Sequence, residues 1–499
     1  MRIKNLSCFF QRKLESILLV MIVLLIFLCF IIQKRLQINN ITCIAKDPYL
    51  TFDNSKVIND LDMYLESVRA PNGLTRSFTD TSSYVFAQES GKFYISHYGR
   101  IGYLEEQAFT YDLSLAVIGY LLLGHSGRAE KILDLLEEDF YLPKNGETGL
   151  YNSYSVSSNI PYNELLLGSD GDRIHAGPML WVAFASLNHM QIEKSTRYLD
   201  FVLDMVNWCR NGLTYYRFPD GGRGGISMGF GWGPDWDKIF STEHNIDYYA
   251  VLKMLHAIYQ EYPETHTIFE KKNIDKKCLK EEMKCVGRFL REVSFDKENY
   301  CFIAGVNPYG IDKTKILDGT TWGIAGVGPE VYASWGIDVD RLIESTEKIF
   351  YSRYNMPDGT YVEGMDITDF EGTGKKRSAL VWWEGTGQHI IALGEMVRYY
   401  YEKGNREKAI LYKKKAIKYM NDMYRFSYFF DLKGALPYMV IRPEEDQIVK
   451  TMQWEWELPR GRNNKWVKSM SSGMWFLYAL KDLHNPMKWE ENRGKGKNE

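Results

Sequence analysis

The chain has 499 residues, a formal net charge of −3, and a composition that is 45% hydrophobic and 14% aromatic. Its length allows one large domain or two to three ordinary ones, and its apolar content can fill a large core. The near-neutral charge argues against a nucleic-acid-binding protein, for which a basic face is expected. With 13 Trp and 34 Tyr, the chain suits a protein that holds a polar, uncharged ligand against aromatic rings, although an aromatic core explains the same surplus.

The N-terminus contains an uncharged apolar run at 17–32, "ILLVMIVLLIFLCFII", close to the length needed to cross a bilayer. Basic residues are concentrated before the run, which places a short tail (1–15) in the cytoplasm and the large domain outside. No small-residue cleavage site follows closely. We therefore predict a single-pass transmembrane signal-anchor at 16–33 and a linker at 34–49; a removed signal peptide and a buried soluble helix are the weaker alternatives.

Helical periodicity dominates the region from about 50 to 485, which no Pro- or Gly-rich linker interrupts. We predict one domain there, followed by a charged tail at 486–499. The seven cysteines include no CxxC pair, so neither a zinc site nor a disulfide framework is indicated. The predicted helices are 57–69, 105–123, 127–139, 177–191, 195–210, 243–261, 276–293, 326–335, 338–354, 379–402, 405–424 and 469–483.

The predicted helices alternate in character. The segments 113–123, 178–190, 248–259, 380–397 and 470–480 are apolar on nearly every side, whereas those between them are amphipathic. Links from an apolar to an amphipathic helix are mostly short, and links in the other direction are long. This pattern predicts six helical hairpins, with an inner ring of buried helices inside an outer amphipathic ring. All the long loops would then lie over the N-terminal ends of the inner helices, around one cleft.

The segment "STEHNIDYYAVL" raises the first question about this cleft. Ser241 or Thr242 can cap the helix, and Glu243 suits its first turn. Asp247 lies a full turn further in, on the same face as Glu243. Two like charges on one face of a buried helix are costly unless that face meets water, a partner or a ligand. We therefore expect both carboxyl groups at the cleft.

Similar polar and aromatic residues occur near the other inner-helix starts. Carboxylic acids interleaved with Trp suit glycoside hydrolysis, in which one acid protonates the departing oxygen and a carboxylate activates water or attacks the anomeric carbon. Structural explanations exist for several of them, such as turn formation for Asp235 and Asp237. His175 and His244 fit hydrogen-bonding roles better than metal ligation, because no HExxH-like spacing is present, and we predict no metal or cofactor. The candidates are Asp112, Asp172, His175, Trp232, Asp235, Trp236, Asp237, Glu243, His244, Asp247, Trp382, Trp383, Glu384, Gln388, Trp454 and Trp456.

The hairpin pattern, together with "TYDLSLAVIGYLLLG", "STEHNIDYYAVL" and "WWEGTGQ", resembles the six-hairpin glycosidases over residues 50–485. This (α/α)6 toroid superfamily contains glycoside hydrolases, phosphorylases and some lyases, and its members act mostly by inversion. The resemblance implies an all-α toroid in which Asp112, Glu243 and Glu384 line the cleft. It does not say which of them is acid and which is base. The segment "GVGPEVYASWG", predicted as the fourth inner helix, matches the pattern least.

These observations predict a membrane-anchored carbohydrate-active enzyme, foremost an inverting glycoside hydrolase acting on an oligo- or polysaccharide. Glu243 is the predicted general acid, Asp112 or Glu384 the base, and Asp247 a neighbour that orients Glu243 or sets its pKa. The alternatives are a polysaccharide lyase or epimerase on the same toroid, and a non-catalytic glycan-binding subunit of the cell envelope. An isoprenoid cyclase is disfavoured because the DDxxD and DxDD motifs are missing. The oligomeric state stays open.

Overall fold

The computed structural model describes Met21, Ile41 and residues 43–45, 47–79, 106–141, 149–158, 173–230, 235–369, 379–441 and 466–490. Apart from Met21, the predicted signal-anchor lies outside these residues, as do most of the linker and the tail beyond Glu490. Within the described ranges, no helix is both long enough and apolar enough to cross a bilayer.

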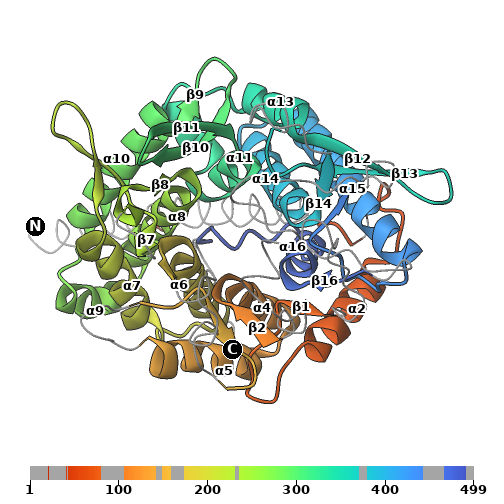
Figure 1. Cartoon of the computed structure of the whole chain (residues 1–499), viewed down its shortest axis with the longest axis horizontal. Coiled ribbons are helices and arrows are strands. Elements are labelled where there is room, and N and C mark those ends of the chain that lie inside the picture. The colour runs from red at the N-terminus through yellow and green to blue at the C-terminus, as the bar shows by residue number, and fades with distance from the viewer. Residues whose placement is uncertain are drawn as a thin grey trace, which may run out of the picture.

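Six inner helices surround a common axis in the described part of the chain (Figure 1). Each packs against the next, and the last packs against the first, so the ring is closed. Their side chains are buried on almost every side, as expected for helices that lack a polar face. They are α4 (Thr110–Leu123), α6 (Ala176–Glu193), α8 (Thr242–Glu261), α11 (Leu317–Trp322), α14 (Trp383–Glu402) and α16 (Met470–Leu480).

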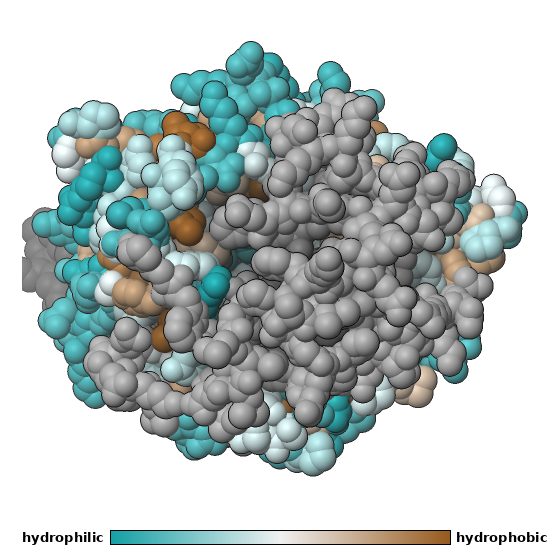
Figure 2. All heavy atoms as spheres, viewed as in Figure 1, coloured by the Kyte–Doolittle hydropathy of each residue, from teal (hydrophilic) through white to brown (hydrophobic). Residues whose placement is uncertain are grey.

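An outer ring of amphipathic helices covers the inner one. Each outer helix packs on the inner helix of its own hairpin, and the N-terminal α2 pairs with the C-terminal α16, so the two ends of the domain share one hairpin (Figure 1). Hydrophilic residues prevail around the described edge of the molecule (Figure 2). The predicted toroid of paired helices is confirmed. The outer helices are α2 (Asn54–Ser67), α5 (Ser126–Asp134), α7 (Leu199–Gly212), α10 (Lys276–Phe289), α13 (Val339–Phe350) and α15 (Arg406–Phe429).

Short helical segments complete the rings. The π-helices η3 (Leu135–Phe140) and η8 (Leu290–Ser294) continue α5 and α10. Between α8 and α10 lie η7 (Pro263–Thr265) and α9 (His266–Lys271), which occupy the one link that is long where a short one is expected. The 3-10 turn η6 (Trp236–Lys238) precedes α8.

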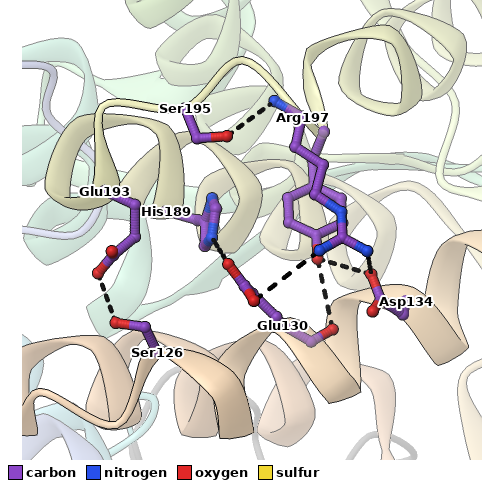
Figure 3. Close-up of polar contacts among 8 residues, drawn as sticks. Ser126, Glu130, Asp134, His189, Glu193, Ser195 and Arg197 are labelled. Atoms are coloured by element: carbon purple, nitrogen blue, oxygen red, sulfur yellow. Dashed lines mark hydrogen bonds and ion pairs between the residues drawn. The ribbon is translucent and has the colours of Figure 1, made fainter.

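A polar cluster joins the first two hairpins (Figure 3). Arg197 Nη2 lies 2.8 Å from Asp134 Oδ1, and His189 Nε2 lies 3.0 Å from Glu130 Oε1. Because Asp134 and Glu130 belong to α5 whereas His189 belongs to α6, these contacts tie neighbouring hairpins together. The Arg197–Asp134 pair is partly exposed and therefore contributes little free energy by itself, whereas the His189 side chain is buried.

The fourth inner helix lies earlier in the chain than predicted. It comprises α11, the π-helix η9 (Gly323–Val327) and, after a break at Gly328 (φ 102°), α12 (Pro329–Ser334). The predicted helix at 326–335 therefore covers α12 and the end of η9 but misses the start of the fourth inner helix. Packing explains the error: a Cβ on Gly319 would lie 2.7 Å from Phe302 Cβ, and one on Gly323 would lie 2.0 Å from the Tyr332 hydroxyl oxygen. These glycines allow close packing, but their low helix propensity obscured the helix in the sequence.

The all-α expectation is also incomplete, because short antiparallel strands precede five of the inner helices in the described residues. These pairs are β1 (Phe78–Thr79) with β16 (Lys468–Ser469), β2 (Gln107–Phe109) with β3 (Ser153–Ser155), β4 (Ile174–His175) with β7 (Gly229–Phe230), β8 (Phe240–Ser241) with β10 (Cys301–Asn307), and β14 (Leu380–Trp382) with β15 (Met439–Ile441). Before α11, Ile316 forms a single bridge with Thr368. Each pairing ends a long loop at a defined point, which fixes where the inner helix begins.

Further hairpins extend from the loops. They are β5 (Tyr215–Arg217) with β6 (Arg223–Ile226), β10 with β9 (Phe295–Asp296) and β11 (Gly310–Lys315), and β12 (Tyr351–Asn355) with β13 (Tyr361–Met365). β13 also pairs with β14, so β12, β13, β14 and β15 form one sheet.

Replacing Asn245 by Ala is expected to lower the free energy of unfolding by about 2–4 kcal/mol. The Asn245 side chain is fully buried; it accepts a hydrogen bond from Ile226 N (2.8 Å) and donates to Ile226 O (3.0 Å) and Ser241 O (2.7 Å). Its loss leaves two backbone groups of β6 buried and unpaired. Urea unfolding measures the change, with Asn207→Ala, which removes one half-buried hydrogen bond, as the control. Equal losses for the two variants would contradict this account.

Candidate active site

One cleft of about 370 Å³ opens among the N-terminal ends of the inner helices. In the described structure, the second residue of every inner helix lines it. The preceding strand or bridge holds the chain at the same level in each hairpin, so equivalent positions face a common space. These residues are Tyr111, Gly177, Glu243, Asp318, Glu384 and Ser471.

The floor of the cleft is aromatic. Trp181 packs with its ring centroid 5.3 Å from that of Trp322 and 5.6 Å from that of Trp475. Tyr111 packs edge-on against Trp181 at 5.1 Å. These three Trp residues lie one helical turn below the cleft-lining residues of α6, α11 and α16, and all are almost fully buried. The acids above them are thus held in poorly hydrated surroundings.

Glu243 and Asp318 form a hydrogen-bonded pair of carboxyl groups. Burial, followed by the charge of Asp318, raises the pKa of Glu243 well above its usual range. Burial raises the pKa of Asp318 to about 6, less than that of its partner because Asp318 also accepts hydrogen bonds. Of the two carboxyl groups, Glu243 therefore holds the proton more tightly, and its hydroxyl donates a hydrogen bond to the Asp318 carboxylate. Ser241 caps α8 by accepting from His244 N (3.4 Å), which fixes the turn that carries Glu243.

Asp247 lies one turn below Glu243 and is completely buried; contrary to the expectation from the sequence, it does not line the cleft. Burial, followed by the charge of Asp318, raises the pKa of Asp247 well above its usual value. Neither the Asp247 carboxyl oxygens nor Trp181 Nε1 has a hydrogen-bond partner among the residues that the structure describes. Asp247 also raises the pKa of Glu243, but less than Asp318 does. The larger neighbouring influence on Glu243 is thus Asp318, which the sequence analysis did not select.

Glu384 is held by a chain of hydrogen bonds. Its Oε1 accepts from the Tyr111 hydroxyl (2.7 Å) and from Gln388 Nε2 (3.2 Å), and Tyr111 in turn accepts from Trp475 Nε1 (2.8 Å). Burial raises the pKa of Glu384 to about 7, while the hydrogen bonds from Ser471, Tyr111 and Gln388 favour its charged form. Glu384 therefore retains a substantial ionised fraction near neutral pH.

Asp112 also lines the cleft and is only 5% exposed. Burial raises its pKa to about 8, although a hydrogen bond from Ser77 favours the ionised form. Asp112 is accordingly protonated for the most part near neutrality. A general base has to be ionised. Of the two predicted bases, Glu384 therefore suits this role better than Asp112 near neutral pH.

Two neutral histidines complete the cleft wall. The His175 ring stacks on Trp236 (centroids 5.0 Å apart, 25° between planes), and the Arg173 guanidinium lies 4.5 Å from the centroid of the same Trp236 ring. Burial keeps the pKa of His175 well below its usual value and lowers that of His244 to about 4. Among the described residues, His175 Nε2 and His244 Nδ1 are buried with no hydrogen-bond partner.

The structure divides the remaining predicted residues into three groups. Trp382 lines the cleft. Gln388 donates a hydrogen bond to the cleft residue Glu384, and Trp236 stacks against the cleft residue His175. Trp383 is completely buried and packs against Phe426 on α15, while Asp235 pairs with Lys238 and Asp237 is exposed; these three do not line the cleft. Asp172, Trp232, Trp454 and Trp456 lie outside the described residues.

Asp318 is the most consequential residue that sequence reasoning missed. The prediction of the fourth inner helix at 326–335 leaves Asp318 in the long loop before it. A usable signal existed: in "ILDGTTW", as in "STEH" and "WWEG", an acid follows an extended, apolar or hydroxyl-bearing residue at a helix start. Within the described part of the chain, no three His, Cys, Asp or Glu side chains are grouped to hold a metal ion.

No protein-family model and no curated protein matches this chain. Among solved structures, it is similar to the cellobiose 2-epimerase from Bacillus thermoamylovorans B4167, at 12% identity over 85% of this chain and 98% of that one, with a TM-score of 0.50. It is also similar to a family 76 glycoside hydrolase from a bovine Bacteroides thetaiotaomicron strain, at 12% identity over 87% and 78% of the two chains, with a TM-score of 0.52. These likenesses show the fold: the described domain is an (α/α)6 toroid.

Proposed function

We propose that this protein is a glycoside hydrolase that cleaves an oligo- or polysaccharide. The observation that carries the proposal is the Glu243–Asp318 pair, in which burial and a neighbouring carboxylate favour the protonated form of Glu243, in the same cleft as a partly ionised Glu384. Pairs of titratable groups whose surroundings differ in this way are typical of acid and base assignments. Similarity to a family 76 glycoside hydrolase is consistent with this chemistry.

In the proposed reaction, Glu243 transfers its proton to the glycosidic oxygen as the bond from that oxygen to the anomeric carbon breaks. Glu384 accepts a proton from a water molecule whose oxygen attacks the anomeric carbon. This single displacement inverts the configuration at that carbon. Asp318 stabilises the protonated form of Glu243 before the reaction, and the aromatic floor keeps water from competing for the acid.

Release of reducing ends from a panel of neutral, acidic and cationic glycans tests the proposal. Proton NMR during the first minutes of digestion then shows whether the anomer produced is inverted. Absence of cleavage by the folded full-length protein across the panel would contradict hydrolysis. An increase in ultraviolet absorbance from a new carbon–carbon double bond would instead indicate a lyase.

Epimerisation is a second candidate, favoured by one specific observation. His175 and His244 are neutral in the cleft and each presents an unpartnered ring nitrogen, as proton abstraction next to a sugar carbonyl requires. One similar structure is a cellobiose 2-epimerase. The two chemistries differ in product, because an epimerase changes the sugar without shortening the chain.

Anchoring of the domain outside the membrane by residues 16–33 is part of the same proposal, and rests on the apolar run and its basic flank. In washed membranes, the full chain should sediment with the lipid, whereas a chain starting at residue 34 should be released. Protease added outside intact cells should reach the domain.

A further inference from the structure

The hairpin of β10 and β11 forms one wall of the cleft. Residues of both strands line the cleft: Ala304 and Val306 on β10, and Asp312 and Thr314 on β11. Asn307, at the end of β10, also lines the cleft. The wall thus leads from the acids at the helix starts to the tip of the hairpin.

The hairpin is rigidly placed relative to Glu243. β10 pairs with β8, the strand that ends directly before α8, in the register Gly305↔Ser241 and Val306↔Phe240. Gly305 has a φ of 129°, and a Cβ there would lie 2.1 Å from Phe240 O, so this close approach requires glycine. From Val306 to the tip is three residues, roughly 10 Å of extended chain. The tip is therefore held at a defined distance from the proton donor.

The tip itself is a tight turn that presents an aromatic ring. Asn307 pairs with Gly310, which leaves Pro308 and Tyr309 as the two turn residues. Asn307 Oδ1 accepts from Tyr309 N (2.9 Å), and Gly310 adopts a φ of 126°. Two features restrict the turn: a proline at its first position, and the hydrogen bond that the Asn side chain accepts from the backbone two residues later. The backbone of Tyr309 is thereby fixed, while its side chain is 98% exposed.

The exposed ring has an apolar neighbour. Ile311, on the adjoining strand, is 55% exposed and does not line the cleft itself, but it is the cross-strand partner of Val306, which does. Hydrophobic residues are visible over β10 and β11 (Figure 2). A Tyr ring has only two rotatable side-chain bonds, so it loses little entropy when it binds a ligand. An aromatic ring on a fixed backbone, next to the polar groups of Asn307 and Asp312, suits a sugar ring, which combines hydroxyls with an apolar C–H face.

We propose that Tyr309 and Ile311 form an outer subsite that binds a sugar unit of a glycan chain remote from the bond at Glu243. The preferred ligand class is then a polysaccharide or long oligosaccharide. This inference rests on the proposed function in one respect only, that the ligand of the cleft is a carbohydrate.

Kinetics on substrates of different length test the subsite. Tyr309→Ala should lower kcat/KM on a cleaved polysaccharide about tenfold and leave kcat/KM on a short aryl glycoside unchanged. Tyr309→Phe and Tyr309→Trp should retain polysaccharide activity, because both keep the ring face. The matched control is Tyr361→Ala, which removes a 47% exposed Tyr from the other long hairpin, outside the cleft lining. Equal losses on long and short substrates, or an equal effect of Tyr361→Ala, would overturn the subsite.

A binding assay without turnover distinguishes a failure of the proposed subsite from a failure of the proposed hydrolysis. Electrophoresis in gels containing mannan, xylan, mixed-linkage β-glucan, alginate or chitosan measures retardation without turnover. In at least one gel, Glu243→Gln should be retarded, and adding Tyr309→Ala should abolish that retardation. If no glycan is cleaved but this loss is seen, the subsite stands and hydrolysis fails. If Glu243→Gln is retarded in none of the gels, or equally with and without Tyr309→Ala, the subsite is rejected.

Discussion

Glu243→Gln is expected to reduce kcat on a cleaved glycan by about 10²- to 10⁴-fold, because glutamine cannot transfer a proton to the departing oxygen. The substitution keeps the size of the side chain and lets the amide donate a hydrogen bond to Asp318. It should therefore affect the chemical step more than substrate binding, with KM changing much less than kcat. The rate of reducing-end release at saturating glycan measures the loss.

The matched control for this variant is Glu344→Gln, which removes a carboxyl group from the exposed face of α13. Its activity should equal that of the unmodified protein. A Glu243→Gln protein that is folded and keeps more than about a tenth of the activity would exclude Glu243 as the general acid. The role would then pass to another protonated acid of the cleft, of which Asp112 is the first to examine.

Asp318→Asn is expected to move the entire pH–activity profile to lower pH by roughly one unit. The charge of Asp318 raises the pKa values of both Glu243 and Glu384, so its removal lowers both. Activity requires Glu243 protonated, which sets the descending limb, and Glu384 ionised, which sets the ascending limb. Both limbs should therefore shift in the same direction, and kcat/KM on the alkaline side should fall about tenfold. The profile of kcat/KM from pH 4 to 9 measures both limbs.

Asp318→Asn should not lower the stability of the protein at pH 7, although it lowers the activity on the alkaline side. The folded-state pKa of Asp318, about 6, exceeds its usual value of 3.8. The folded protein therefore holds this proton more tightly than the unfolded chain does, and stability falls as pH rises through the window between these values. Asparagine removes that loss, so the Tm of Asp318→Asn at pH 7 should equal or exceed that of the unmodified protein. Asp139→Asn, at an exposed position on η3, is the control for lost charge alone.

A decreased Tm together with an unshifted pH profile would mean that Asp318 has only a structural role. A shifted profile with an undiminished Tm would show that Asp318 sets the protonation state of the acid. The two measurements together distinguish damage to the fold from a change in the electrostatics of the cleft.

Much of the architecture was predictable from local pattern. An inner helix such as α14 is apolar all round and an outer helix such as α10 has one charged face, because the first is covered on every side and the second on one. The lengths of the links then placed all the inner-helix starts on one face. Glu243 was found because a like charge one turn below it had no local explanation.

Other features depended on contacts that are distant in the sequence. Strands of two or three residues carry too short a pattern to be recognised, and Phe78 of β1 pairs with Ser469 of β16 near the other end of the domain. Trp382 and Trp383 are adjacent and chemically identical, yet one lines the cleft and the other packs against α15. Trp382 ends β14, which pairs with β13 and β15, whereas Trp383 begins α14, so their directions depend on strands from other parts of the chain.

The sequence by itself determined the hairpin architecture and brought Asp112, Glu243 and Glu384 to one cleft, because helix periodicity and loop length are local properties. Only the tertiary structure decided the pairing of Glu243 with Asp318, the position of the fourth inner helix and the protonation of the acids. The physical reason is that a carboxyl group's pKa depends on its burial and on nearby charges, and both are supplied here by helices from separate hairpins.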